Sequence, residues 1–311
     1  MFERVALGGL TVLVGERGGK YPGGNSILVE DDIRLIVDPS TNVAAAGADA
    51  VGGVDIVVNS HAHEDHFAGN FLFPDASLVL HEADAPAMAS LEALLAAYGM
   101  DEASEQAWGR LVVEQYNFRP RGDAVSVRDG DVLDLGRTRV RFLHMPGHTA
   151  GHMCLLFEPE GIVFTGDLDL TRFGPYYGDA TASLTDVIAS LARLRALEGV
   201  TAFVSFHEAG IVRDDLRGAV DRYAAVLADR DAALLDFCRE PRTIEEIGAQ
   251  CIIYRKRYPH LSWQPHVEKV MMKQHATRLV ALGRMRQEGD RYRSEESSPS
   301  ASRISISAGS Q

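Results

Sequence analysis

The 311-residue sequence predicts an α/β domain followed by a smaller helical domain. The first two thirds of the chain contain short β-branched and aliphatic runs, separated by turns rich in glycine, asparagine and aspartate, which is typical of strands. Segments with helical spacing of apolar residues lie between these runs. After about residue 222 the strand-like runs give way to helical patterns. We therefore predict a larger α/β domain over residues 1–222, a helical domain over 223–294 and a serine-rich, disordered tail over 295–311.

The strands expected in the larger domain are short. The apolar residues of Val54–Val58 indicate a strand that is buried on both faces. The expected strands are Leu10–Val14, Ser26–Val29, Ile33–Val37, Val54–Val58, Leu78–Leu80, Val140–Leu143, Met153–Phe157, Gly161–Phe164 and Thr201–Val204.

Two helices are expected between these strands. Ala85–Met100 is rich in alanine and leucine and ends near Gly99. Ser183–Leu197 carries apolar residues at helical spacing, with Ser183 as the N-cap and Gly199 just past the end.

The C-terminal region is expected to hold three helices. Tyr223–Arg239 forms the first, and Pro241 interrupts the pattern. Thr243–Glu246 is a capping-box sequence that begins the second helix, and Lys269–Arg286 forms the third. A glycine turn and the strand-like Arg291–Arg293 follow, so the region is similar to a winged helix.

The charge composition limits the kinds of molecule that the protein is expected to bind. The net charge is −13, although residues 251–293 hold 10 lysines and arginines against 3 aspartates and glutamates. A strongly acidic body does not attract polyanions at long range, so nucleic acid is an alternative partner only for the basic segment. We expect a small-molecule substrate, and a homodimer is compatible with the sequence.

The sequence also indicates a compartment. No apolar run reaches the roughly 18 residues of a membrane span, so no membrane partner is expected. The three cysteines lack the spacing of a metal site or of a disulfide framework, which fits a reducing compartment. The first residues lack the basic start and the cleavage site of a signal peptide. We therefore expect a cytoplasmic protein.

The segment Ser60–His66, with the sequence SHAHEDH, carries the densest set of metal-ligand side chains. It places His61, His63, Asp65 and His66 directly after the strand expected at Val54–Val58. Neutral imidazoles and a carboxylate at this density suit Zn²⁺ or Fe²⁺. A polar surface loop is the alternative, and the density of ligand types argues against it.

Further ligands follow other expected strands. His148 comes after Val140–Leu143, Asp167 after Gly161–Phe164, and His207 after Thr201–Val204. Ligands at successive strand ends are what a site at the edge of a sheet would require.

At this point the chain resembles the metallo-β-lactamase superfamily. The matching segments are SHAHEDH, PGHTAGH, FTGDLDL and VSFHEAG, in the order of the family, and the resemblance covers about residues 1–220. It implies an αββα sandwich with a two-metal site between the sheets. By this resemblance one metal is held by His61, His63 and His148, the other by Asp65, His66 and His207, and Asp167 bridges both.

The resemblance implies a metal-dependent hydrolase. Two divalent ions, Zn²⁺ or alternatively Fe²⁺ or Mn²⁺, would support attack of a metal-bridging hydroxide on a thioester or ester of a small acyl substrate. The segment 148–152 is similar to that of glyoxalase II-type thioesterases.

Three residues, Asp65, His152 and Tyr176, are candidates for the chemistry beyond metal binding. His152 is expected to orient a ligand or to face the substrate, with a packed structural histidine as the alternative. Tyr176, on the loop 173–179, is a candidate donor to the oxyanion, with a packing role as the alternative. Asp38 resembles a buried supporting aspartate of the family. Packing or surface roles are expected for the histidines at 81, 144, 260, 266 and 275.

Three other functions compete with the thioesterase hypothesis. The C-terminal helices resemble those of the β-lactamase-like protein 2 subgroup, which implies a ribonuclease or phosphodiesterase that uses the basic segment. An iron-dependent persulfide dioxygenase would share the histidine motif. A regulatory or scaffold protein is disfavoured by the complete ligand set.

Overall fold

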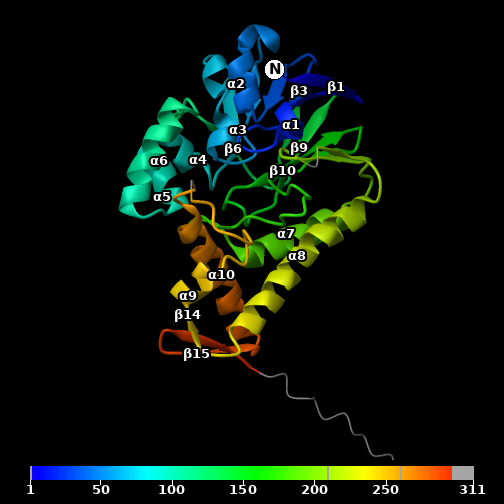
Figure 1. Cartoon of the computed structure of the whole chain (residues 1–311). Helices are drawn as coiled ribbons and strands as arrows, with labels where there is room; N and C mark the ends of the chain where they lie inside the picture. Colours follow the sequence, from blue (N-terminus) through cyan, green and yellow to red (C-terminus); the bar gives the residue numbers. More distant parts are fainter. Residues whose placement is uncertain (1, 209, 260, 296–311) are drawn as a thin grey trace, which may run out of the picture.

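The computed structural model describes residues 2–208, 210–259 and 261–295. Two mixed β-sheets face each other, and helices cover the outer face of each sheet (Figure 1). The predicted αββα architecture with a C-terminal helical region is confirmed. The tail expected to be disordered lies, from residue 296 on, outside the described residues.

The first sheet has its strands in sequence order. Strands β1 to β4 pair antiparallel, whereas β4 to β7 pair parallel. Its strands are β1 (Glu3–Leu7), β2 (Leu10–Val14), β3 (Ser26–Val29), β4 (Leu35–Val37), β5 (Ile56–Val58), β6 (Ser77–His81) and β7 (Val125–Val127).

The second sheet has the order β13-β12-β11-β10-β9-β8, and β11 and β12 form its one parallel pair among the described residues. Its strands are β8 (Val132–Asp134), β9 (Arg139–His144), β10 (Met153–Glu158), β11 (Ile162–Phe164), β12 (Ala202–Val204) and β13 (Ile211–Val212).

Alternation along the strands builds separate apolar layers. Val12 and Ile27 point between the sheets and pack with Phe142 and Leu155 of the second sheet. Leu28, next to Ile27, points to the opposite face and packs under the helices there. The two sheets thus share one buried interior, and each is covered by helices on its outer face.

The helices that cover the first sheet differ from the prediction at one point. The segment 85–100, expected as one helix, forms α4 (Ala85–Ala89) and α5 (Leu91–Tyr98). Ser90 between them is extended, and its hydroxyl accepts a hydrogen bond from the Ala93 amide as the N-cap of α5. The other helices and turns of this half are α1 (Glu16–Gly19), α2 (Thr41–Ala46), η1 (Ala48–Ala50), α3 (Glu64–Phe67), η2 (Asn70–Leu72) and α6 (Glu102–Glu114).

The helix α7 (Leu184–Ala196) begins after Ser183, whose side chain accepts from the Asp186 amide, as predicted. The helix α8 (Leu216–Phe237) begins earlier than expected and runs across residue 222, so the division into domains at that residue stays a prediction. The Thr243 capping box of α9 (Ile244–Ala249) is present.

The last helix was predicted too late in the chain. The helix α10 (Gln264–Ala281) begins with Pro265 in its first turn. It ends before Gly283, which has a φ of +67°, and residues up to 286 therefore leave the helix. A small sheet of order β14-β16-β15 follows and lies farthest from the N-terminal strands (Figure 1). Its strands are β14 (Arg242–Thr243), β15 (Met285–Glu288) and β16 (Arg291–Ser294).

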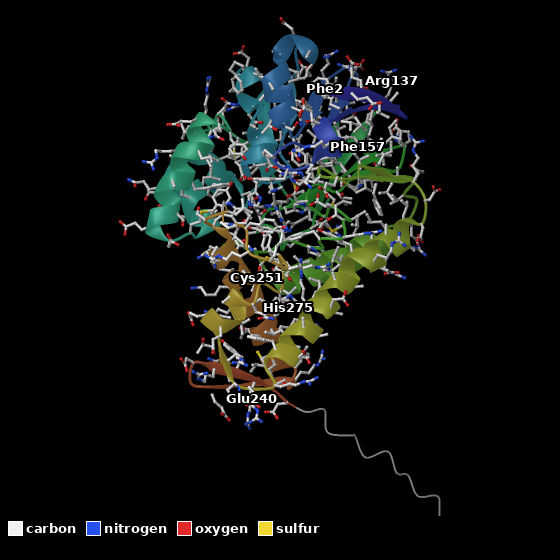
Figure 2. The ribbon with its side chains drawn as sticks, in the orientation of Figure 1. Phe2, Arg137, Phe157, Glu240, Cys251 and His275 are labelled. Carbon is white, nitrogen blue, oxygen red and sulfur yellow. The ribbon has the colours of Figure 1, made fainter. Side chains whose placement is uncertain are left out.

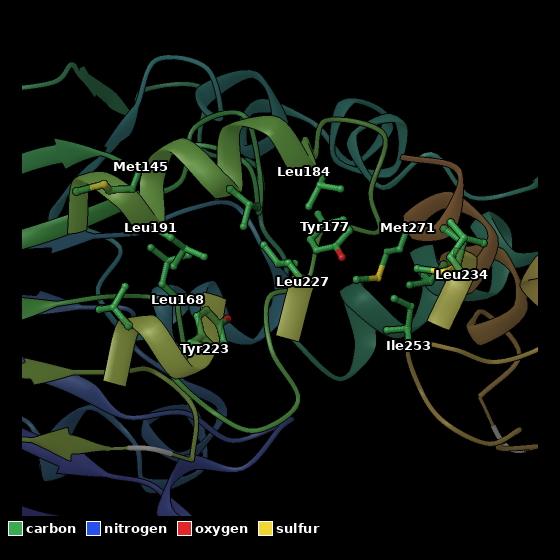
Figure 3. Packing of buried hydrophobic residues seen from close by; sticks show 14 of the residues in the cluster. Met145, Leu168, Tyr177, Leu184, Leu191, Tyr223, Leu227, Leu234, Ile253 and Met271 are labelled. Carbon is green, nitrogen blue, oxygen red and sulfur yellow. The ribbon is translucent and has the colours of Figure 1, made fainter. Parts of the chain in front are cut away.

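The C-terminal helices share a core with the outer face of the second sheet. Leu168, Leu191 and Tyr223 pack in one cluster with Leu234 and Met271 (Figure 3). Figure 2 labels His275 within this helical region and Glu240 at its far end. Among the described residues, no helix is long and apolar enough to cross a membrane.

Candidate metal centre

The candidate ligands lie at the ends of neighbouring strands. The loop 60–66 follows β5 and continues into α3. His148 follows β9, Asp167 follows β11, and His207 follows β12. The structure brings together all seven residues expected as ligands, and all are buried.

Within the cluster, the side chains divide into two groups. Inside each group, the ligand atoms lie within 4.8 Å of one another. In the first group, His148 Nε2 lies 3.1 Å from His61 Nε2, 2.9 Å from His63 Nδ1 and 3.2 Å from Asp167 Oδ2. The second group consists of Asp65, His66 and His207.

Asp167 lies between the two groups. Its Oδ2 faces His148, and its Oδ1 lies 2.9 Å from His66 Nε2. In the second group, His207 Nε2 lies 3.2 Å from Asp65 Oδ2. One carboxylate therefore reaches both groups.

Each histidine of the cluster turns one ring nitrogen inward and has the other bound by a fixed partner. The outward pairs are His61 Nδ1 with Ser60 Oγ (3.0 Å), His63 Nε2 with Asp179 Oδ2 (2.7 Å), His66 Nδ1 with Asp38 Oδ2 (2.8 Å), His148 Nδ1 with the Tyr176 carbonyl (3.1 Å) and His207 Nδ1 with the Gly19 carbonyl (2.9 Å). A carbonyl or carboxylate partner requires the outward nitrogen to carry the hydrogen. The inward nitrogens are then free to offer lone pairs.

Three inward atoms lack a hydrogen-bond partner although they are buried: His66 Nε2, Asp65 Oδ2 and Asp167 Oδ1. They lie within ion-pair distance of neighbours, but the geometry is not that of hydrogen bonds. Buried polar atoms without partners are costly, and a cation at the centre of these atoms would satisfy them. The donor set and its geometry fit divalent metal ions.

The charged side chains of the cluster shift one another's pKa values. Burial disfavours a charge on His66, but the carboxylates of Asp167 and Asp38 outweigh it and raise the pKa of His66 well above its ordinary value. Burial and the neighbouring His66 instead lower the pKa of His61 well below its ordinary value. Burial alone would raise the pKa of Asp167, yet the surrounding histidines hold it well below its usual range.

Asp38 braces the loop 60–66 from behind. It is fully buried and accepts hydrogen bonds from the Ser60 amide (2.7 Å) and the Ser60 hydroxyl (2.6 Å), in addition to the contact with His66. Asp38, which was expected from the resemblance as a buried supporting aspartate, thus makes three contacts to the loop 60–66.

Asp84 is a residue that sequence reasoning missed. Its carboxylate accepts from the Ala62 amide (3.1 Å), the Thr149 hydroxyl (2.7 Å) and the Gly151 amide (2.7 Å). It thus ties the loop 60–66 to the loop that carries His148. No local pattern marks Asp84, because its partners lie 22 to 67 positions away.

His152 lies behind the cluster and is fully buried. Its Nδ1 faces the Met145 carbonyl at 2.9 Å, and its Nε2 accepts from the Asp167 amide at 3.1 Å. Both ring nitrogens are therefore bound to backbone groups, and one of these groups is the amide of Asp167.

Tyr176 lies beside the first group, with its ring centroid 5.5 Å from that of His148. Its hydroxyl donates to Asp179 Oδ1 at 3.0 Å, while Asp179 Oδ2 contacts His63. Asp179 was not singled out from the sequence; its place in the loop 173–179 beside Tyr176 was the available signal.

A second group of missed residues surrounds Glu64, which is buried within α3. Its carboxylate accepts from the hydroxyls of Tyr98 and Tyr21, and Tyr21 also contacts Tyr116. Tyr21 is 44% exposed, and its ring lies edge-on to that of His207.

Most of the remaining histidines have packing contacts. The rings of His81 and His144 stack at 3.8 Å, and His275 is buried among polar partners of the C-terminal helices. His266 is half-buried, and His260 lies outside the described residues.

Comparison with known proteins agrees with this geometry. The sequence profile of the Metallo-beta-lactamase superfamily matches residues 21–207. The chain belongs to this superfamily. The family and the enzyme class predicted from the sequence motifs, a hydrolase of this superfamily, are confirmed.

Named relatives add to this assignment. The chain is 26% identical over 241 residues to the hydroxyacylglutathione hydrolase of Methylococcus capsulatus, covering 73% of this chain and 78% of the relative. It is 28% identical over 148 residues to the acyl-coenzyme A thioesterase MBLAC2 of Bos taurus, covering 45% of this chain and 50% of the relative. The matches to four further curated relatives span 36–55% of the length of those relatives.

Solved structures support the fold over nearly the whole chain. A metallo-beta-lactamase family protein from Thermus thermophilus has a TM-score of 0.70 at 22% identity, covering 93% of this chain and 99% of that chain. TTHA1623, solved in a di-iron-bound form, has a TM-score of 0.51 at 25% identity, covering 71% of this chain and 98% of that chain.

Proposed function

We propose that this protein is a dinuclear metal-dependent hydrolase that cleaves a thioester of a small acyl substrate. The observation that carries the proposal is the pair of buried ligand groups that share Asp167, with inward atoms that have no hydrogen-bond partner. The named relatives support the substrate class, because they include a hydroxyacylglutathione hydrolase and acyl-coenzyme A thioesterases.

His61, His63 and His148 would hold one ion, and Asp65, His66 and His207 the other, with Asp167 shared. Imidazole and carboxylate donors suit Zn²⁺, Fe²⁺ and Mn²⁺, and Zn²⁺ is our first choice. When bound, two such ions would lower the pKa of a water to about 7 and polarise the thioester carbonyl.

The residues of this chain would orient the reactants. Asp65 presents its second carboxylate oxygen toward the cluster, 3.8 Å from His66 Nε2, and we assign it the role of orienting the attacking water. His152 holds Asp167 through the backbone amide and therefore has a positioning role. The ring of Tyr176 lies beside His148 and would border the acyl group, while its hydroxyl is committed to Asp179.

A thiolate leaving group fits the way in which the histidines of the cluster are bound. A thiol has a pKa of about 8.5, so a thiolate leaves without a strong general acid. Among the described residues, each histidine of the cluster has its outward nitrogen bound, and no free imidazole stands ready to protonate a leaving group. This favours a thioester over an amide.

A substrate panel tests the proposal. Zinc-loaded protein should hydrolyse glutathione or coenzyme A thioesters faster than lactones, simple esters or bis-p-nitrophenyl phosphate, and a chelator should abolish the activity. Turnover of the phosphodiester alone would replace the proposal with the nuclease alternative. Oxygen uptake with a persulfide substrate would replace it with the dioxygenase alternative.

A further inference from the structure

The loop 173–184 contacts the metal centre on one side and the C-terminal helices on the other. On the side of the centre, the Tyr176 carbonyl binds His148 Nδ1 and Asp179 binds His63 Nε2. Two of the three histidines of the first group therefore depend on this loop for their orientation. The residues that hold this loop in place therefore also help to orient the histidines of the site.

Arg230 of α8 anchors the first half of the loop. It is only 3% exposed, and its guanidinium donates to the Pro175 carbonyl (2.6 Å), the Phe173 carbonyl (2.7 Å) and the Tyr177 hydroxyl (2.9 Å). A buried arginine that uses its donors on loop carbonyls fixes backbone in a way that a surface ion pair does not.

Gln274 of α10 anchors the second half. Its amide nitrogen donates to the Tyr177 carbonyl at 3.0 Å, and its amide oxygen accepts from the Leu184 amide at 2.6 Å. It thereby joins the loop to the start of α7. Arg230 and Gln274 hold the backbone on both sides of Asp179.

His275 of α10 completes the anchor through the Tyr177 side chain. Its Nε2 lies 2.6 Å from the Tyr177 hydroxyl, and its Nδ1 lies 2.6 Å from Asp231 Oδ1. The carboxylate partner places the hydrogen on Nδ1, so Nε2 accepts from the tyrosine, whose oxygen accepts in turn from Arg230. Tyr177 lies between α7 and α10 in the packed cluster (Figure 3).

Two glycines allow the helices to come this close. A Cβ at Gly174, which has a φ of +81°, would lie 2.5 Å from a Val226 side-chain carbon of α8. A Cβ at Gly178 would lie 2.5 Å from a Val267 side-chain carbon of α10. The loop sequence is thus matched to direct contact with both helices.

We propose that Arg230 and Gln274 are positioning residues of the metal centre: through the loop 173–184 they hold Asp179 and the Tyr176 carbonyl against His63 and His148. The C-terminal helices are on this account part of the metal site and not an independent appendage. The inference rests on the proposed metal-dependent function.

The test is a Co²⁺ titration of the full-length protein after metal removal, followed by visible absorption and calorimetry. Arg230→Gln should weaken Co²⁺ at one of two sites by about tenfold and change the spectrum of that site. This is the lower end of the roughly 10- to 100-fold typical for loss of a partner that contacts a ligand directly, because Arg230 acts through the loop. Arg230→Lys, which can still donate to one carbonyl, should give an intermediate affinity. Gln274→Ala should weaken the same site, and it keeps the test available if Arg230→Gln does not fold.

The matched control is Leu234→Ala, on the same helix and fully buried in the same cluster. It should lower the melting temperature yet keep wild-type Co²⁺ affinity and spectrum. The proposal is overturned if Arg230→Gln and Gln274→Ala both bind Co²⁺ as the wild type does, or if Leu234→Ala weakens binding equally. A wild-type protein that binds no Co²⁺ would instead refute the proposed function itself.

Discussion

Asp84 offers the sharpest test of how the two ligand loops are held together. Replacing it with alanine removes the acceptor for the Ala62 amide, the Gly151 amide and the Thr149 hydroxyl, all of them buried or nearly so. The hydroxyl can rotate toward another acceptor, but the two amides cannot. Each unpaired buried donor costs about 1–3 kcal/mol, so Asp84→Ala should lower the free energy of unfolding by about 2–6 kcal/mol.

That loss is a large share of the roughly 5–15 kcal/mol by which a domain is stable. Asp84→Asn keeps one acceptor oxygen and loses the charge, so its cost should be smaller, at about 1–3 kcal/mol. Urea unfolding of the metal-free proteins measures both values, with the slope of the transition checked for each variant.

The exposed Asp75 supplies the control. Asp75→Ala should change the free energy of unfolding by no more than about 0.5 kcal/mol. If Asp84→Ala were as stable as Asp75→Ala, the three contacts would not hold the loops, and the reasoning from buried hydrogen bonds would be wrong at this site.

Three further outcomes are expected. His152→Ala should keep its metal stoichiometry and lose about 10- to 100-fold in kcat, since it orients Asp167 through the backbone; unchanged kcat would remove it from the site. Tyr176→Phe should alter kcat and KM by less than about threefold each, because its hydroxyl serves Asp179 and the phenylalanine keeps the ring; a hundredfold loss of kcat would make the hydroxyl an oxyanion donor after all. Burial lowers the pKa of His275 relative to the unfolded chain, so the unfolded state takes up the proton first and the folded state loses stability as the pH drops below about 6.5. The melting temperature of His275→Gln should therefore fall less between about pH 6.5 and about pH 5 than that of the wild type. Identical slopes of melting temperature against pH would contradict this.

Most of the candidate ligands could be predicted from local sequence, because they follow directly after strands. The apolar strand β5 predicts where the loop 60–66 begins, and each of the later ligands stands within a few residues of a predicted strand. The fold brings these strand ends to one edge, so local patterns could mark the seven candidates, whereas their division between two metals came from the resemblance to the family motifs.

The surroundings of the site were not predictable in the same way. Asp84, Asp179 and Tyr21 act through contacts with residues far away in the chain, for which short patterns carry no information. The break at Ser90 was also missed, because the alanine-rich composition favours helix throughout and only the capping hydrogen bond to Ala93 shows the end. His275 was expected in a packing or surface role, but its two polar partners come from other elements.

Anomalous diffraction from crystals of the zinc-loaded protein, recorded at the zinc edge, tests the central claim most directly. The account predicts two peaks about 3.5–4 Å apart, one contacted by His61, His63 and His148 and the other by Asp65, His66 and His207, with Asp167 touching both. A single peak, or two peaks that do not share Asp167, would contradict it.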